Sequence, residues 1–156
     1  PACLTPGQDR THRGNLTMLF SLTAKARYLL AGNPAAPMQL LEEYAESDDS
    51  HIRARVAENP RTPLRLLIKF VHDDNAEVRI NLANNPVVTD MLLTELAKDR
   101  DADVRFSLAE NPAIPRVILE KLSKDENPYV AHRAQRTLEK LEAIFPTVQH
   151  PQFQAA

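Results

Sequence analysis

Apolar and polar positions follow one another along the central part of the chain with a period of 26 residues. The period is marked by four Asn-Pro dipeptides, which are Asn33-Pro34, Asn59-Pro60, Asn85-Pro86 and Asn111-Pro112. Counted from each Asn, positions 8, 9 and 12 are apolar or aromatic, and this spacing places them on one face of a helix. Positions 20 and 24 carry a second apolar set, which predicts a second helix. A fixed period in this range is typical of a solenoid, whose repeats bury their apolar faces against their neighbours.

The pattern therefore predicts an all-α solenoid of four 26-residue two-helix repeats, with a partial or capping helix at each end. The full repeats are residues 33–58, 59–84, 85–110 and 111–136. We predict a single solenoid domain over 16–145, an irregular segment or N-terminal cap over 1–15, and a C-terminal tail over 146–156.

The flanking helices are predicted from residues that continue the pattern beyond the full repeats. Ala26, Arg27, Leu30 and Ala31 match positions 20, 21, 24 and 25 of a partial repeat. Apolar spacing continues through Leu138, Leu141 and Ile144. This spacing predicts one long terminal helix that fuses the last second helix with a cap.

Polar residues and prolines predict where the helices begin and end. Proline at position 5 suits the first residue of a helix of about ten residues, and Thr62 before Pro63 is a natural N-cap. Position 17 is predicted to cap the second helix, and it holds Asp49, Asn75, Asp101 and Asn127. The acidic residues around it offset the helix dipole, and they lack the dense ligand pattern and glycine turn of a calcium loop. The next Asn-Pro then ends the second helix, because proline disfavours the α conformation in the residue before it.

The string V-R-x-x-L-A-x-N-P-x-x-P-x-x-L-L-x-x-L-x-x-D, which recurs over residues 26–136, resembles the leucine-rich repeat variant family. That resemblance implies a right-handed superhelix of alternating α- and 3₁₀-helical segments. The units of this chain are slightly longer than those of the family, which favours a fully α-helical first segment, as in a compact HEAT-like pair. One member of the family carries a cysteine-ligated iron–sulfur cluster, but Cys3 is the only cysteine here, so no cofactor is carried over.

Position 21 forms a ladder of arginines, which are Arg27, Arg53, Arg79 and Arg105. One interpretation is a row of guanidinium groups that grips phosphate or carboxylate groups of a partner. The other is that each arginine pairs with an acidic turn residue such as Asp73, Asp99 or Asp125. We favour the second, because an arginine so close to an apolar core needs a partner.

Position 22 carries a largely apolar strip, which consists of Tyr28, Ala54, Ile80, Phe106 and His132. If these residues are buried, they help to stack the repeats, which is the usual role of apolar residues at helical spacing. If they are exposed, they form a partner-binding strip. The sequence leaves both possibilities open. We name Tyr28, Ile80, Phe106 and His132, together with the arginine ladder, as the candidate partner-binding residues.

Catalytic motifs are not found in the sequence. It contains no nucleophile elbow, phosphate loop or dinucleotide-binding glycine pattern, and its five histidines occupy unmatched repeat positions without metal-ligand spacing. The formal net charge of −2 disfavours a general polyanion binder. No apolar run reaches membrane-spanning length, and one cysteine fits a reducing compartment, so we expect a cytoplasmic protein.

These observations predict a non-catalytic scaffold that binds a protein or peptide, with no metal and no cofactor. The alternative is a nucleic-acid-binding HEAT-like module, or a protein similar to HEAT-like DNA-repair glycosylases, for which the arginine ladder is the support.

Overall fold

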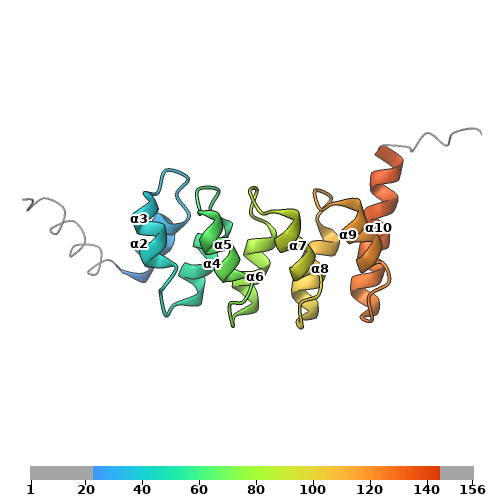
Figure 1. Ribbon diagram of the computed structural model, residues 1–156, viewed down its shortest axis with the longest axis horizontal. Helices are drawn as coiled ribbons and strands as arrows, with labels where there is room; N and C mark the ends of the chain where they lie inside the picture. The colour runs from blue at the N-terminus through green and yellow to red at the C-terminus, as the bar shows by residue number, and fades with distance from the viewer. Residues whose placement is uncertain (1–22, 145–156) are drawn as a thin grey trace, which may run out of the picture.

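The computed structural model describes residues 23–144, and every regular element among them is an α-helix. The helices are α2 (Ala24–Ala31), α3 (Met38–Tyr44), α4 (Ser50–Glu58), α5 (Leu64–Phe70), α6 (Ala76–Ala83), α7 (Asp90–Leu96), α8 (Ala102–Glu110), α9 (Arg116–Leu122) and α10 (Pro128–Ile144). They follow one another in chain order along the long axis of the molecule, from α2 at one end to α10 at the other (Figure 1). The all-α prediction is confirmed for this part of the chain. The predicted segment 1–15 and the predicted tail 146–156 lie outside it.

Each 26-residue unit contains a short first helix and a longer second helix. The first helices, α3, α5, α7 and α9, have seven residues each. The second helices pack on one another in succession, α2 on α4, α4 on α6, α6 on α8 and α8 on α10. Each first helix contacts the second helix of its own pair and the one before it. This packing is compatible with a helical repeat.

The core consists of the apolar positions that the sequence pattern marked. First helices contribute Leu40, Leu41, Tyr44, Leu66, Leu67, Phe70, Leu92, Leu93, Leu96, Ile118, Leu119 and Leu122, all buried. Second helices contribute Ile52, Val56, Val78, Leu82, Val104, Leu108, Val130 and Ala134, also buried. Burying a Leu, Ile, Val or Phe side chain stabilises a fold by about 1.5–3 kcal/mol. The core is therefore one continuous layer between the first and second helices.

The predicted caps of the second helices are confirmed. The side chains of Asp49, Asn75 and Asp101 accept hydrogen bonds from the backbone N–H two residues further on, at 2.8 to 3.0 Å. Asn127 does the same for Tyr129 N at 2.9 Å. The predicted terminal helix is confirmed as well, because α10 runs without a break from Pro128 to Ile144.

The beginnings of the first helices differ from the prediction. Pro37, Pro63 and Pro115 lie just before the helix in an extended conformation, and seven residues follow instead of about ten. Thr62 does not cap α5, since it lies two residues before the first helical residue. Its hydroxyl is buried and donates at 2.5 Å to Val56 O near the end of α4, a carbonyl that also accepts from Asn59 N at 3.1 Å. The first segments are α-helical rather than 3₁₀-helical, in keeping with their longer units.

Asn59 and Asn85, which belong to two of the Asn-Pro dipeptides, do more than end a helix. Asn85 is 2% exposed, and its Nδ2 donates to Ala57 O at 2.6 Å and Asn59 O at 3.0 Å. Its Oδ1 accepts from Val87 N at 2.8 Å. Asn59 makes the equivalent bonds one unit earlier, to Ala31 O at 2.7 Å and Asn33 O at 2.9 Å. One side chain thus donates to carbonyls at the boundary between the two preceding units and shapes its own turn.

An equivalent hydrogen bond to a carbonyl 28 residues earlier is made by a different residue, Thr137, near the C-terminal end of the described residues. Thr137 occupies the position that follows Asn111 by one period, and it lies inside α10 rather than in a turn. Its Oγ1 donates to Ala109 O at 2.6 Å. A threonine is sufficient there, because no turn has to be shaped.

We predict that Asn85→Ala lowers the free energy of unfolding by about 1–3 kcal/mol, because the carbonyl of buried Ala57 loses the Asn85 donor and that of Asn59 keeps only Thr62 N. Urea denaturation followed by circular dichroism measures the effect. The control is Asn84→Ala, which removes an exposed side chain bonded only to its own helix. Equal losses in the two variants would contradict this role of Asn85.

Candidate functional site

The arginine ladder lies beside the turns between first and second helices, where Asp residues of the next unit meet it. Arg79 donates from Nε to Asp99 Oδ2 at 2.7 Å and from Nη2 to Asp99 Oδ1 at 3.0 Å. Arg53 binds Asp73 in the same way at 2.8 and 2.9 Å, and Arg105 binds Asp125 at 2.8 and 3.0 Å. Two parallel N–H···O bonds per pair are the strong, orientation-specific form of this interaction. The predicted pairing with acidic turn residues is confirmed for these three arginines.

Each paired arginine also holds its own turn. Nη1 donates to a backbone carbonyl six residues earlier, which is Ser47 O for Arg53, Asp73 O for Arg79 and Asp99 O for Arg105, at 2.6 to 2.8 Å. Each aspartate is also oriented within its own turn, because its Oδ1 accepts from the backbone N–H two residues further on. The arginine and the aspartate of each ion pair are therefore each held by hydrogen bonds within their own turn. The packing of adjacent units brings the two side chains together.

These ion pairs are largely shielded from solvent, and their arginines keep few free hydrogen-bond donors. The side chains of Arg79 and Asp99 are 5% and 6% exposed. Burial works to raise the pKa of Asp73, but the hydrogen bonds and charge of Arg53 hold that pKa below its ordinary value. The pKa of Asp125 is lowered by Arg105 against the same opposing effect of burial. The hydrogen bonds that Arg53, Arg79 and Arg105 donate to these aspartates raise the pKa of each guanidinium group.

Arg27, the first arginine of the ladder, differs from the other three. The residue twenty positions further along, where the others find an Asp, is Ser47. The Nε of Arg27 is buried, and it has no hydrogen-bond partner among the described residues.

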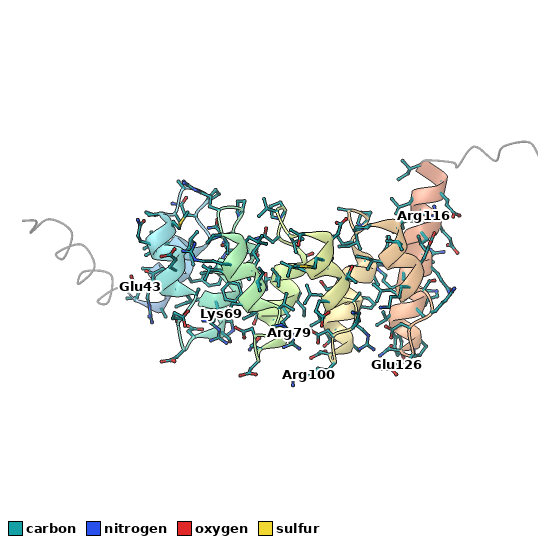
Figure 2. The ribbon with its side chains drawn as sticks, in the orientation of Figure 1. Glu43, Lys69, Arg79, Arg100, Arg116 and Glu126 are labelled. Atoms are coloured by element: carbon teal, nitrogen blue, oxygen red, sulfur yellow. The ribbon has the colours of Figure 1, made fainter. Side chains whose placement is uncertain are left out.

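Shallow clefts lie along this edge, beside the turns between first and second helices. The cleft between the turns of the second and third units has a volume of about 280 Å³ and is lined by His72, Asp74, Arg79, Lys98 and Asp99, among others. Figure 2 shows Lys69, Arg79, Arg100 and Glu126 toward this edge, while Arg116 lies toward the opposite edge. Charged side chains dominate the lining. Among the described residues, no group of three or more His, Cys, Asp or Glu side chains is arranged to hold a metal ion.

The exposed side of the second helices, which we call the second-helix face, carries the position-22 residues. Tyr28 is 39% exposed and His132 is exposed, while Ile80 and Phe106 are half-buried and pack against the core with one side. Ala54 is buried. The strip thus divides between the two roles that the sequence left open.

Two arginines that the sequence interpretation did not name complete this face. The guanidinium carbon of Arg55 lies 4.8 Å from the centre of the Tyr28 ring, and that of Arg133 lies 5.9 Å from the centre of the Phe106 ring. Both distances are in the range of a cation–π interaction. The signal in the sequence is an aromatic residue at position 22 followed by an arginine at position 23 of the next unit. It is visible only once adjacent second helices are known to pack side by side.

The opposite side of the molecule carries apolar residues that are also exposed. They lie on or next to the first helices and comprise Met38, Leu64, Ile68, Val87, Met91 and Val117. No arginine is stacked on an aromatic ring there among the described residues. This first-helix face provides matched control positions for tests of the second-helix face.

Comparison of the chain with protein-family models, curated proteins and solved structures returned no match. Between residues 23 and 144, no helix combines the length and apolar character that crossing a membrane requires.

We predict that Arg79→Met lowers the free energy of unfolding by about 3–5 kcal/mol, because it leaves the Asp99 carboxylate buried without its partner. The double variant Arg79→Met with Asp99→Leu is expected to recover most of this loss, since it removes both charges. Chemical denaturation of both variants measures the difference. A double variant no more stable than the single one would contradict a buried ion pair.

The lowered pKa values predict a loss of stability in acid. Asp73 and Asp125 have folded pKa values below the unfolded value of about 3.9. Their stabilisation is therefore complete above the unfolded value and is lost as the pH falls through the folded values. Unfolding free energies measured between about pH 5 and pH 2 should fall less steeply in Asp125→Asn than in the unsubstituted chain. An unchanged slope would show that Asp125 does not contribute.

Proposed function

We propose that the chain is a non-catalytic scaffold that binds a protein or peptide through the second-helix face. The observation that carries the proposal is the pair of arginine–aromatic stacks, Arg55 on Tyr28 and Arg133 on Phe106, with Ile80 between them in the order of the packed helices. Tyrosine and arginine are among the residues most enriched in the energetically dominant parts of protein interfaces. Stacking also orders each arginine before a partner arrives, which reduces the entropy lost on binding.

The saturation of the arginine ladder supports this proposal over the nucleic-acid alternative. Arg53, Arg79 and Arg105 already direct three of their donor groups at protein oxygens. Phosphate contacts supply most of the affinity of non-specific nucleic-acid binders, and these arginines are bound to aspartates instead. The remaining support for a DNA-repair role is the resemblance to helical repeat proteins, which is an argument from fold alone.

The architecture that we propose is a right-handed solenoid of four 26-residue repeats of the leucine-rich repeat variant type. The 26-residue recurrence of the Asn hydrogen bonds and the 20-residue offset of the Arg–Asp pairs support the repeat. In such an array successive second helices present equivalent positions in a row, and a peptide can contact several of them at once. A single cysteine supports the expected cytoplasmic location.

The proposal is tested with peptides selected from a random display library on the immobilised full chain. We expect the selected peptides to lose about tenfold or more in affinity when Tyr28→Ala and Phe106→Ala are combined, because two aromatic anchors are lost. The matched control combines Met91→Ala and Val117→Ala on the first-helix face, and it should leave affinity unchanged. Circular dichroism confirms that both variants remain folded.

Two outcomes would contradict the proposal. One is a set of peptides whose affinity depends on Met91 and Val117 rather than on Tyr28 and Phe106. The other is binding of DNA or RNA oligonucleotides with an affinity that falls steeply as salt rises, which would support the nucleic-acid alternative.

A further inference from the structure

The first unit lacks the carboxylate that completes the arginine ladder in the following units. Ser47 stands where Asp73, Asp99 and Asp125 stand in those units. Its Oγ accepts from Asp49 N at 3.2 Å, as each aspartate accepts from the backbone N–H two residues further on. Serine therefore keeps the hydrogen bond that shapes the turn. It is too short and has too few acceptors to bind Arg27 as the aspartates bind their arginines.

Two buried hydrogen-bonding groups lie beside Ser47. They are Arg27 Nε and the hydroxyl of Tyr44, a residue that is only 2% exposed, and neither has a hydrogen-bond partner among residues 23–144. Burial raises the pKa of the Tyr44 hydroxyl, Glu43 adds to this effect and Arg27 opposes it, so both charges lie close to the hydroxyl. Buried donors without an acceptor are rare because they cost free energy. Both groups therefore indicate a site for an acceptor.

Arg27, Tyr44 and Ser47 line one cleft, which has a volume of about 550 Å³. Small-molecule sites in proteins have volumes of about 300–1,000 Å³. The following units show which group fits between these side chains, because each of their aspartates binds its arginine through Nε and Nη2 at 2.7 to 3.0 Å. A ligand carboxylate in the same place can accept from the Arg27 guanidinium group and also from the Tyr44 hydroxyl.

The rim of the cleft is acidic, which sets a second requirement. Glu43, Glu46, Asp48 and Asp49 complete the lining. Glu46 is paired with Lys69 at 2.6 Å, and Asp49 accepts from the first turn of α4 at 3.0 Å. Glu43, which Figure 2 shows at the end of the molecule that α2 and α3 form, and Asp48 make no ion pair with any described residue. A carboxylate bound beside them needs positive charge of its own, since like charges repel.

The charges of a cationic α-amino acid match those of the cleft. Arg27, Glu43 and Asp48 provide one positive and two negative charges, and such an amino acid carries one carboxylate and two cationic groups. A simple carboxylate leaves both acidic residues unmatched, and a diamine leaves Arg27 Nε and the Tyr44 hydroxyl without an acceptor. The C-terminal lysine of a peptide meets only two of the three requirements, because its α-nitrogen is an uncharged amide.

We propose that the cleft of Arg27 and Tyr44 binds a free α-amino acid with a cationic side chain, such as lysine or arginine. The ligand carboxylate accepts hydrogen bonds from Arg27 Nε and from the Tyr44 hydroxyl, and so takes the place that an aspartate fills in the following units. The α-ammonium group and the side-chain cation lie against Glu43 and Asp48. This inference does not depend on the function proposed above, because it concerns the edge of the molecule that carries the arginine ladder.

The test is a titration of the nitrogen-labelled full chain with L-lysine, followed by NMR at Arg27 Nε–H, whose resonance is identified by its loss in Arg27→Gln. We expect a saturable shift with a Kd of about 1 mM or lower. Three probes each lack one charged group: cadaverine lacks the carboxylate, Nα-acetyl-L-lysine the α-ammonium group and L-norleucine the side-chain cation. Each should bind about tenfold more weakly, since it loses one charge-assisted contact.

Either of two results in this titration would overturn the proposal. One is an Arg27 Nε–H resonance that shows no saturable shift with L-lysine, as expected if water alone occupies the cleft. The other is a probe that binds as tightly as L-lysine although it lacks one of the three charges.

Ser47→Asp separates this site from a general attraction of cations to an acidic surface. The variant adds a negative charge, so a general attraction would strengthen the binding of L-lysine. We expect the reverse, a loss of about tenfold or more in affinity together with greater stability to urea, because the new carboxylate binds Arg27 itself. Thr94→Asp on α7 adds the same charge at an exposed position away from the cleft and should leave the affinity unchanged. Unchanged or tighter binding in Ser47→Asp would contradict the proposal.

Discussion

Helices of seven to nine residues are too short to persist in water by themselves, and this constraint governs the whole molecule. Each first helix offers three buried apolar side chains and can bury them only against second helices on both sides. A first helix and its second helix therefore cannot fold alone as a pair. The order of one helix pair depends on contact with the next helix pair. For this reason, each contact between adjacent helix pairs contributes to the cooperative folding of the array.

Polar side chains join the pairs on both sides of this apolar layer. On one side, Asn59 and Asn85 donate to carbonyls that lie on both sides of the preceding unit boundary. On the other, Arg53, Arg79 and Arg105 bind aspartates of the following unit. Buried ion pairs recover only part of the free energy lost when their charges leave water, so apolar packing must provide most of the stability. We interpret the polar connections as setting the register, since a pair shifted by one helical turn would leave buried donors and acceptors unmatched.

Much of this arrangement follows from the sequence, because it is encoded locally and repeated. The apolar positions, the caps at Asp49, Asn75 and Asp101, the fused helix α10 and the pairing of three arginines with aspartates were all predicted correctly. What the sequence did not reveal depends on contacts between units. From the sequence, the Asn residues are interpreted as helix terminators and Thr62 as a cap, while Arg55 and Arg133 are not among the predicted site residues. Each of these residues acts on an atom that is brought near only by packing, from six to twenty-eight residues away in the chain.

Native-state hydrogen exchange of the unsubstituted chain, residue by residue, tests most directly the claim that adjacent pairs stabilise one another. The account predicts that the amides of α6 and α8, which have neighbours on both sides, open with the largest free energies, and that protection falls gradually toward α2. It also predicts that α5 and α7 open together with the second helices that flank them. Protection that is equal in every pair, or first helices that exchange independently of their neighbours, would contradict it.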